Sequence, residues 1–257
     1  LKLSRGLGDV YKRQALISFT VVGGIANSAS CPKSGGILKY GVKAEPPTYD
    51  MHGTNSYAVM HFVAQHYSTL LTFDWNKFPK LEGDVADSWN VSSDGLTYTF
   101  KLKKGIKFHD GTPLTSKDVK ATYDRLSNPP EGVISVRKAL FSSISGITTP
   151  DDSTVVFKLS SPDAFMLDGF ASPFNAIYSA KDIAKDPKWH LKNINGTGPY
   201  KFVAHKKGES WKAEKFADFH HGDNCLDGTE SFRIKKVAEP LIGGQIMAEW
   251  RGTAPPE

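Results

Sequence analysis

The stretch from residue 89 to residue 126 constrains the fold more than any other part of the sequence. Within it, residues 98–102 alternate between large apolar side chains and Thr or Lys, the pattern of a β-strand with one buried face. Asp94-Gly95 precedes this strand and Asp110-Gly111 follows it, and both pairs are typical of tight turns. The segment therefore predicts β structure whose strands end in tight turns.

A helix is predicted directly after the second turn. Thr115 followed by Asp118 resembles a capping box, with a shorter acid than the usual Glu. An apolar stripe over residues 119–126 follows, and the two prolines at 129–130 end the helix. Residues 56–71 are rich in apolar side chains and contain no Gly or Pro, so they predict a second helix packed on the core.

The remaining elements are shorter. Residues 161–183 are expected to be helical in part, with an interruption near Pro173. The run at 196–199, Gly-Thr-Gly-Pro, predicts a tight turn that leads into a strand. Further strands are predicted at residues 37–42, 155–159, 200–203 and 231–237.

Size and charge exclude several classes of protein. The 257 residues include 15 Phe, 9 Tyr and 5 Trp, enough for one large domain or two smaller ones with a substantial core. Residues 1–14 carry four basic side chains and one acidic side chain, and they hold most of the formal net charge of +5. No basic cluster marks a face of the remaining chain, so we do not expect nucleic-acid binding.

Residues 1–30 have the pattern of a signal peptide. Basic residues precede an uncharged apolar run at 15–25, and small residues follow at 26–30. The apolar run is too short to cross a bilayer as a helix. Residues 1–14 also resemble a translated sequencing-adapter stretch, which would make them an assembly artefact.

The sequence allows two ways of processing the end of the leader. A signal peptidase could cut near Ala29 or Ser30. Alternatively, Ser28-Ala29-Ser30-Cys31 resembles a weak lipobox that lacks its usual Leu, and Cys31 would then be lipidated. Both alternatives predict export.

We find no motif for catalysis, a cofactor or a metal. The 196–199 turn lacks the helix that a phosphate-binding loop needs, and no catalytic triad is evident. His220, His221, Asp223 and Cys225 are close in sequence, but their spacing fits no standard metal site and favours a solvated loop. His61 and His66 are five residues apart and are interpreted as ordinary helix residues.

A series of short motifs extends over residues 35–240. They are GGIL at 35–38, PPTYD at 46–50, VADSW at 85–89, SSDGLTYTFKL at 92–102, KFHDGTP at 107–113, GTGPY at 196–200 and LDG at 226–228. Their order and spacing resemble the extracytoplasmic solute-binding proteins of ABC importers, family 5, which bind peptides, nickel or opines. Tyr49 and Met51 depart from the residues common in that family.

The resemblance implies an α/β protein with mixed sheets, similar to type II periplasmic binding proteins, that closes on its ligand between two lobes. Members are about twice as long, so we interpret this chain as an N-terminal fragment. Lobe I would comprise residues 31–58 and 163–242, with an inserted subdomain at 59–162. Residues 243–257 would lead towards a missing second lobe.

The resemblance also points to a ligand-contact loop. In this family, contacts from the first lobe follow the 46–50 motif, which here places Asn55, Ser56 and Tyr57 at the contact positions. Their amide, hydroxyl and aromatic groups suit a peptide main chain or another polar ligand. The alternative is that Asn55 or Ser56 caps the helix that follows.

The function implied by the resemblance is transport, not catalysis. The protein would capture peptides in the periplasm, as a monomer when full length and without a cofactor, and deliver them to an ABC permease. Nickel-chelate, haem, opine or oligosaccharide ligands are alternatives on the same scaffold. A secreted hydrolase is the alternative from a different class.

Overall fold

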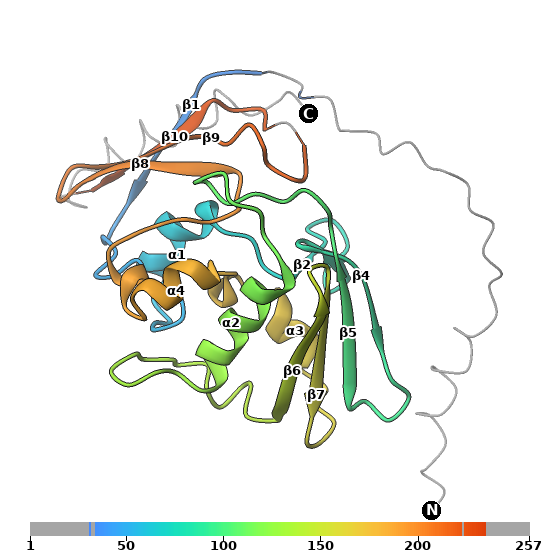
Figure 1. Cartoon of the computed structure of the whole chain (residues 1–257). Coiled ribbons are helices and arrows are strands. Elements are labelled where there is room, and N and C mark those ends of the chain that lie inside the picture. Colours follow the sequence, from blue (N-terminus) through green and yellow to red (C-terminus); the bar gives the residue numbers. More distant parts are fainter. Residues whose placement is uncertain (1–30, 32–33, 223, 235–257) are drawn as a thin grey trace, which may run out of the picture. The chain divides into compact units, whose positions relative to one another are not determined.

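The computed structural model describes residues 31, 34–222 and 224–234 (Figure 1). The predicted signal peptide, the adapter-like stretch and the end at 243–257 lie outside these residues. The described residues from Cys31 onward form one compact unit. Among the described residues, no helix is long and apolar enough to cross a bilayer.

The first sheet joins the two ends of the described chain. Its order is β1-β10-β9-β8; β1 pairs in parallel with β10, and the other pairs are antiparallel. The strands are β1 (Ile37–Val42), β8 (Tyr200–Lys206), β9 (Ser210–Lys215) and β10 (Gly228–Arg233). Trp211 is fully buried on this sheet and contacts Phe62 and Tyr49. These residues belong to a first hydrophobic core that also includes Met51 and Tyr178.

The second sheet is antiparallel and has its own core. Its order is β4-β5-β7-β6, from β4 (Ala86–Val91), β5 (Thr97–Leu102), β6 (Ile144–Asp151) and β7 (Thr154–Leu159). Helices α2 (Ser116–Ser127) and α3 (Met166–Ala171) supply the apolar residues that cover it. Phe100, Tyr123, Phe157 and Phe170 form the centre, with ring centroids 4.8–5.7 Å apart in the contacting pairs. A short hairpin of β2 (Leu71–Phe73) and β3 (Leu81–Gly83) lies beside this core.

The predicted helix at 56–71 is wrong in its second half. Helix α1 spans only Tyr57–Val63, and a 3-10 turn at Ala64–His66 ends it. From Tyr67 the chain is extended, and the Leu70 carbonyl accepts a hydrogen bond from the Ala86 N–H at 3.0 Å. Leu70 and Leu71 are buried in the second core, so backbone pairing with the β3–β4 corner outweighs the local helical spacing.

Most other predicted elements are confirmed. The Asp118 carboxylate accepts a hydrogen bond from the Thr115 backbone N–H at 2.7 Å, which completes the capping box of α2. Residues 161–183 contain α3, a 3-10 turn at Pro173–Asn175 and the start of α4 (Ala180–Lys185). The strand predicted at 231–237 begins earlier, at Gly228, and its last predicted residues lie outside the described range. The mixed α/β fold is therefore confirmed.

The two cores do not follow the predicted domain boundaries closely. Val59, Phe62 and Val63 were assigned to the inserted subdomain, but they pack in the first core, beneath the β1-β10-β9-β8 sheet. The second core begins at Leu70. Because the described chain forms one compact unit, the division into lobe and subdomain stays a prediction.

Candidate functional site

A buried ion pair anchors the segment that precedes the predicted contact residues. Arg125 on α2 donates to Asp50 through both terminal nitrogens, at 2.6 and 3.2 Å, and both side chains are almost completely buried. Tyr178 also donates to the Asp50 carboxylate, at 3.2 Å. Burial acts to raise the pKa of Asp50, but the positive charges facing it, from His52 when protonated and from Arg125, hold the pKa below its usual value.

His52 extends this network towards the second half of the chain. Its Nε2 lies 2.9 Å from the Ala176 carbonyl, and its Nδ1 lies 2.9 Å from an Arg125 nitrogen. Since Arg125 can only donate, His52 must be neutral with its proton on Nε2. Burial, together with the nearby Arg125 charge, lowers the pKa of His52 to about 4. The His52 ring stacks on Tyr178 at 4.0 Å.

The contact loop, residues 53–57, follows directly from this anchor. The Thr54 hydroxyl accepts a hydrogen bond from the Ser56 N–H at 3.0 Å, and the Ser56 hydroxyl accepts one from the Ala58 N–H at 3.2 Å. Ser56 is thus the N-cap of α1. Asn55 is exposed, and Tyr57 is 66% exposed. The loop therefore presents an amide and an aromatic ring on a backbone that its own hydrogen bonds fix.

A second segment, the brace loop at residues 132–137, lies against the contact loop. The Val136 N–H donates to the His52 carbonyl at 3.1 Å. Arg137 donates to the Asn55 side-chain oxygen and, at 3.3 Å, to the Thr54 carbonyl. Its guanidinium group lies 4.6 Å from the centre of the Phe174 ring, a cation–π arrangement. Arg137 therefore fixes the orientation of the predicted contact residue Asn55.

The two loops together form a mixed surface. Ile134 is 68% exposed and Val136 is 41% exposed, close to the polar groups of the contact loop. A cavity of about 250 Å³ opens between Gly53, Ile134 and Lys188, with the Asp50–Arg125 pair in its wall. Small molecules are commonly bound by apolar surface that carries a few fixed polar groups. This surface has that composition.

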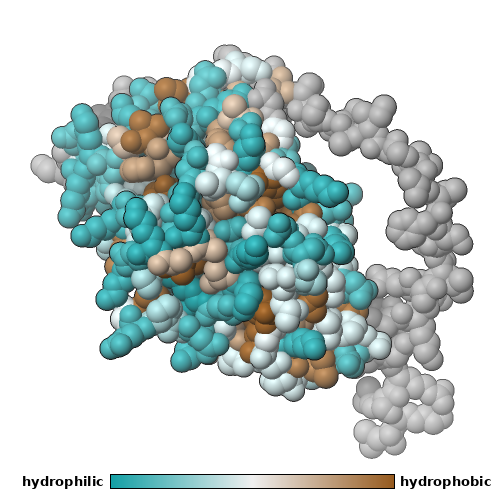
Figure 2. Space-filling model, in the orientation of Figure 1, coloured by the Kyte–Doolittle hydropathy of each residue, from teal (hydrophilic) through white to brown (hydrophobic). Residues whose placement is uncertain are grey.

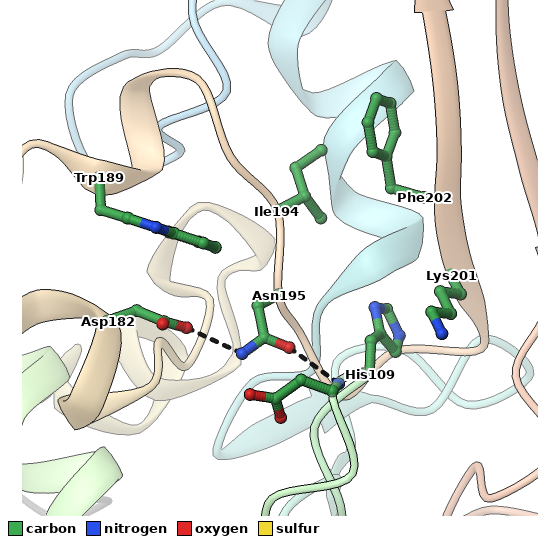
Figure 3. A pocket seen from close by; sticks show the side chains of 8 residues that line it. His109, Asp182, Trp189, Ile194, Asn195, Lys201 and Phe202 are labelled. Carbon is green, nitrogen blue, oxygen red and sulfur yellow. Dashed lines mark hydrogen bonds between the residues drawn. The ribbon is translucent and has the colours of Figure 1, made fainter. Parts of the chain in front are cut away.

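A larger cavity of about 340 Å³ lies between His109, Trp189 and Phe202, with Asp182 of α4 in its lining (Figure 3). Asn195 crosses its wall: the side chain donates to Asp182 at 2.8 Å and accepts from the Asp110 N–H at 3.2 Å. These polar groups satisfy one another, so we interpret them as tying the 109–110 turn to α4. Figure 2 shows a mainly hydrophilic surface broken by small apolar patches.

The structure brings Asn55, Ser56 and Tyr57 together on one loop, as their adjacency requires, and two of the three side chains are exposed. Whether they contact a ligand stays a prediction. Sequence reasoning missed Arg137 and Arg125. An arginine within the apolar stripe of a predicted helix was the available signal for Arg125, whereas Arg137 carries no local signal.

The structure pairs Cys31 with Cys225, whereas the sequence raised lipidation as an alternative for Cys31. Cys31 and Cys225 form a disulfide. Lipidation of Cys31 requires the same sulfur, so it is incompatible with this bond. Cys225 is likewise removed from the four-donor cluster at 220–225, and Asp223 lies outside the described residues.

Comparison with known proteins identifies the scaffold. Residues 80–239, more than half of the chain, match the model of the bacterial extracellular solute-binding proteins, family 5 middle region. The chain belongs to this family. The matched region includes the turns at 94–95 and 110–111, helix α2 and strands β4 to β10, so the family match covers most of the second core and most of the first sheet.

Individual relatives agree with this assignment. A putative ABC transporter peptide-binding protein of Brucella ovis is 41% identical over 147 residues, covering 55% of this chain and 27% of the relative. AgaA from A. tumefaciens R10, solved with agropinic acid, is 34% identical with a TM-score of 0.71 and covers 77% of this chain and 40% of its own. AppA from Bacillus subtilis, solved with a nonapeptide, is 27% identical with a TM-score of 0.75 and covers 85% of this chain and 43% of its own.

This chain therefore spans about a quarter of the curated Brucella relative and less than half of each solved structure. The similarity extends through both sheets, because the solved structures align with most of the described residues. The fold is that of extracytoplasmic solute-binding proteins, and the predicted resemblance is confirmed.

Proposed function

We propose that this chain forms the first lobe of an extracytoplasmic solute-binding protein that captures peptides for an ABC importer. The family assignment supports a binding role, and the names of the Brucella protein and of the AppA complex favour peptides among the possible ligands. The single observation that carries the proposal is the contact loop, which holds Asn55 and Tyr57 exposed above a buried ion pair.

The geometry suits a peptide main chain. Such a ligand offers alternating N–H donors and carbonyl acceptors. The Asn55 amide can serve both, and Arg137 holds its oxygen so that the amide nitrogen is directed away from the brace loop. Tyr57 supplies aromatic area for a ligand side chain and a hydroxyl at its rim. Because the anchor is buried and hydrogen-bonded, we expect little ordering on binding.

Capture would be completed by a second lobe that closes over this surface. The exposed apolar side chains of the brace loop, Ile134 and Val136, would then be covered together with the ligand. The closed form would be recognised by a permease. In this scheme the protein works as a monomer in the periplasm and makes no chemical change to its ligand.

A second ligand class is favoured by one comparison. AgaA, which is 34% identical to this chain, was solved with agropinic acid. A small organic acid in place of a peptide would be recognised mainly through charge, so an arginine at the site would matter more than the aromatic ring. Arg137 is a basic side chain that contacts the contact loop.

Tyr57→Ala tests the proposal in the longer protein that carries this chain. Calorimetric titration with defined di- to nonapeptides should show binding by the parent protein and roughly 5- to 150-fold weaker binding by the variant, the effect of removing an aromatic anchor. Trp75→Ala is the matched control, because Trp75 is 92% exposed on the β2–β3 hairpin. Unchanged affinity in Tyr57→Ala would remove Tyr57 from the site. Binding of organic acids but not peptides would favour the second ligand class.

A further inference from the structure

Three potential metal ligands converge where the β9–β10 loop meets the β3–β4 corner. The Nε2 atoms of His220 and His221 each lie 2.9 Å from the same oxygen, Oδ1 of Asp84. The three ligand atoms lie within 4.8 Å of one another. Asp84 is 136 residues away from His220 in the sequence, so only the fold brings them together.

The backbone turn at residues 219–221 directs both imidazole rings to the same side. Their ring centroids are 4.4 Å apart, and Phe219 packs against both rings. Adjacent residues of a regular strand would point to opposite faces. The turn therefore produces a pair of nitrogen donors that one ion can share.

The other oxygen of Asp84 is already used. Oδ2 accepts a hydrogen bond from the Thr69 N–H at 2.7 Å, which fixes the carboxylate plane and leaves Oδ1 to the two histidines. The side chains of Asp84 and His220 are 13% and 5% exposed, whereas that of His221 is 38% exposed. One side of the cluster is thus held inside the protein and the other is open to water.

We propose that Asp84, His220 and His221 form a binding site for a divalent first-row transition-metal ion such as Zn²⁺ or Ni²⁺. Two imidazole nitrogens and one carboxylate oxygen are a donor set that suits these ions and does not suit Ca²⁺ or Mg²⁺, which prefer oxygen ligands only. Water would complete the coordination on the side where His221 is exposed.

The spacing between Asp84 and each histidine needs little adjustment, and the two histidine nitrogens already lie within 4.8 Å of each other. With metal–ligand distances of about 2.0–2.2 Å, neighbouring ligands of a tetrahedral ion are about 3.3 Å apart. The histidine nitrogens are 2.9 Å from the Asp84 oxygen, so they would separate from it by a few tenths of an ångström as the ion enters between them. The His220 Nδ1 atom has no hydrogen-bond partner among the described residues. Because such partners strengthen metal binding by 10- to 100-fold, we expect micromolar and not nanomolar affinity.

An ion here would link the two halves of the fold. Asp84 belongs to the corner that leads into β4 of the second sheet, and the histidines belong to a loop of the first sheet. The same loop is held by the Cys31–Cys225 disulfide and by a Lys107–Asp218 ion pair at 3.0 Å. The site is separate from the contact loop, so its failure or success would be independent of the proposed peptide binding.

Isothermal titration of the tag-free 257-residue chain with ZnCl₂ and NiCl₂, and cobalt(II) absorption spectroscopy, test the site. We expect one equivalent to bind with micromolar affinity, and the thermal unfolding temperature to rise with free metal concentration because the ion binds the folded chain. His221→Ala and Asp84→Asn should each weaken binding at least tenfold.

His61→Ala is the matched control, since His61 is the exposed histidine of α1. It should bind metal like the parent chain. Because His221 is partly exposed, we expect the His221→Ala variant to fold normally. Its fold is checked by comparing the circular dichroism spectrum of the variant with that of the parent chain. No saturable one-equivalent binding by the parent, or equal binding by His221→Ala and the parent, would overturn the proposal.

Discussion

The Asp50–Arg125 pair determines how firmly the contact loop is held. Arg125→Met would leave the Asp50 carboxylate buried without its main counter-charge at neutral pH, because His52 is then neutral. Breaking a buried ion pair in this way typically costs about 3–5 kcal/mol. We expect a loss of that size in the free energy of unfolding, measured by urea denaturation at pH 7.

Lys120→Met is the matched control for this prediction. Lys120 lies on the same helix and pairs with Asp124 at 2.7 Å, but the two side chains are 40% and 48% exposed. Exposed i,i+4 pairs contribute about 0.3–0.5 kcal/mol. Equal destabilisation by the two substitutions would show that the buried pair does not have the role assigned to it.

Buried neutral histidines predict the pH dependence of stability. Burial lowers the pKa of His109 to about 4 and that of His66 to about 3, against an ordinary value of about 6.5. Between these values the unfolded chain binds protons that the folded chain does not, so stability rises with pH. The contribution of these neutral histidines to the free energy of unfolding should be fully present above about pH 6.5 and should decrease as the pH drops towards 4.

Each such histidine contributes a slope of up to about 1.4 kcal/mol per pH unit. His109→Gln should therefore reduce the slope of unfolding free energy against pH near pH 5 by about that amount, measured by denaturation at several pH values. The exposed His61 serves as a control through His61→Ala. A slope unchanged in His109→Gln would contradict the assignment.

The glycines at 196 and 198 are needed for a reason that the sequence pattern did not show. The sequence predicts a tight turn that leads into a strand; the structure has a bend at 198–199, and strand β8 begins at Tyr200. The structure gives a further reason for the glycines: a Cβ on Gly196 would lie 1.9 Å from the His66 carbonyl oxygen, and one on Gly198 would lie 2.5 Å from the Tyr67 nitrogen. Two backbone segments cross here, which no local pattern reveals.

Among the elements, α1 has a special position because it begins inside the contact loop. Ser56→Ala would remove the N-cap hydroxyl that accepts from the Ala58 N–H. Such a loss costs about 0.5–2 kcal/mol. We expect a decrease of that size in thermal unfolding experiments, and Ser56→Thr, which keeps a hydroxyl, should restore most of it. No change in either variant would mean that the cap is not needed.

Strands were easier to predict from the sequence than helix ends. Residues 97–102 alternate strictly between apolar and polar side chains, and residues 154–159 do so except at Val156; this period is set by the strand itself. The end of α1 is set instead by pairing of Leu70 with residues some fifteen positions away. Likewise, Asn55 could be placed by motif, but Arg137, which holds it, comes from a loop 82 residues further on.

At the scale of the whole molecule, one covalent bond joins the start of the described chain to the β9–β10 loop. Cys31 and Cys225 are 194 residues apart and are the two cysteines of the sequence. Nothing in their local sequence predicted the pairing, because it depends on β1 lying next to β10. The Gly35 N–H donates to the Cys225 carbonyl at 2.7 Å, so the backbone already holds the two segments together.

The disulfide predicts that both cysteines are oxidised in the secreted protein and that the bond contributes to the free energy of unfolding. Because it closes a loop of nearly 200 residues, it restricts the unfolded chain strongly, and removing it should cost about 2–5 kcal/mol. Denaturation of a Cys31→Ser, Cys225→Ser double variant would measure this loss. Protein secreted into an oxidising compartment should resist alkylation until it is reduced, and its intact mass should be lower by two hydrogen atoms. A lipid-modified Cys31 in the mature protein, or free thiols that react without reductant, would show that the bond does not form.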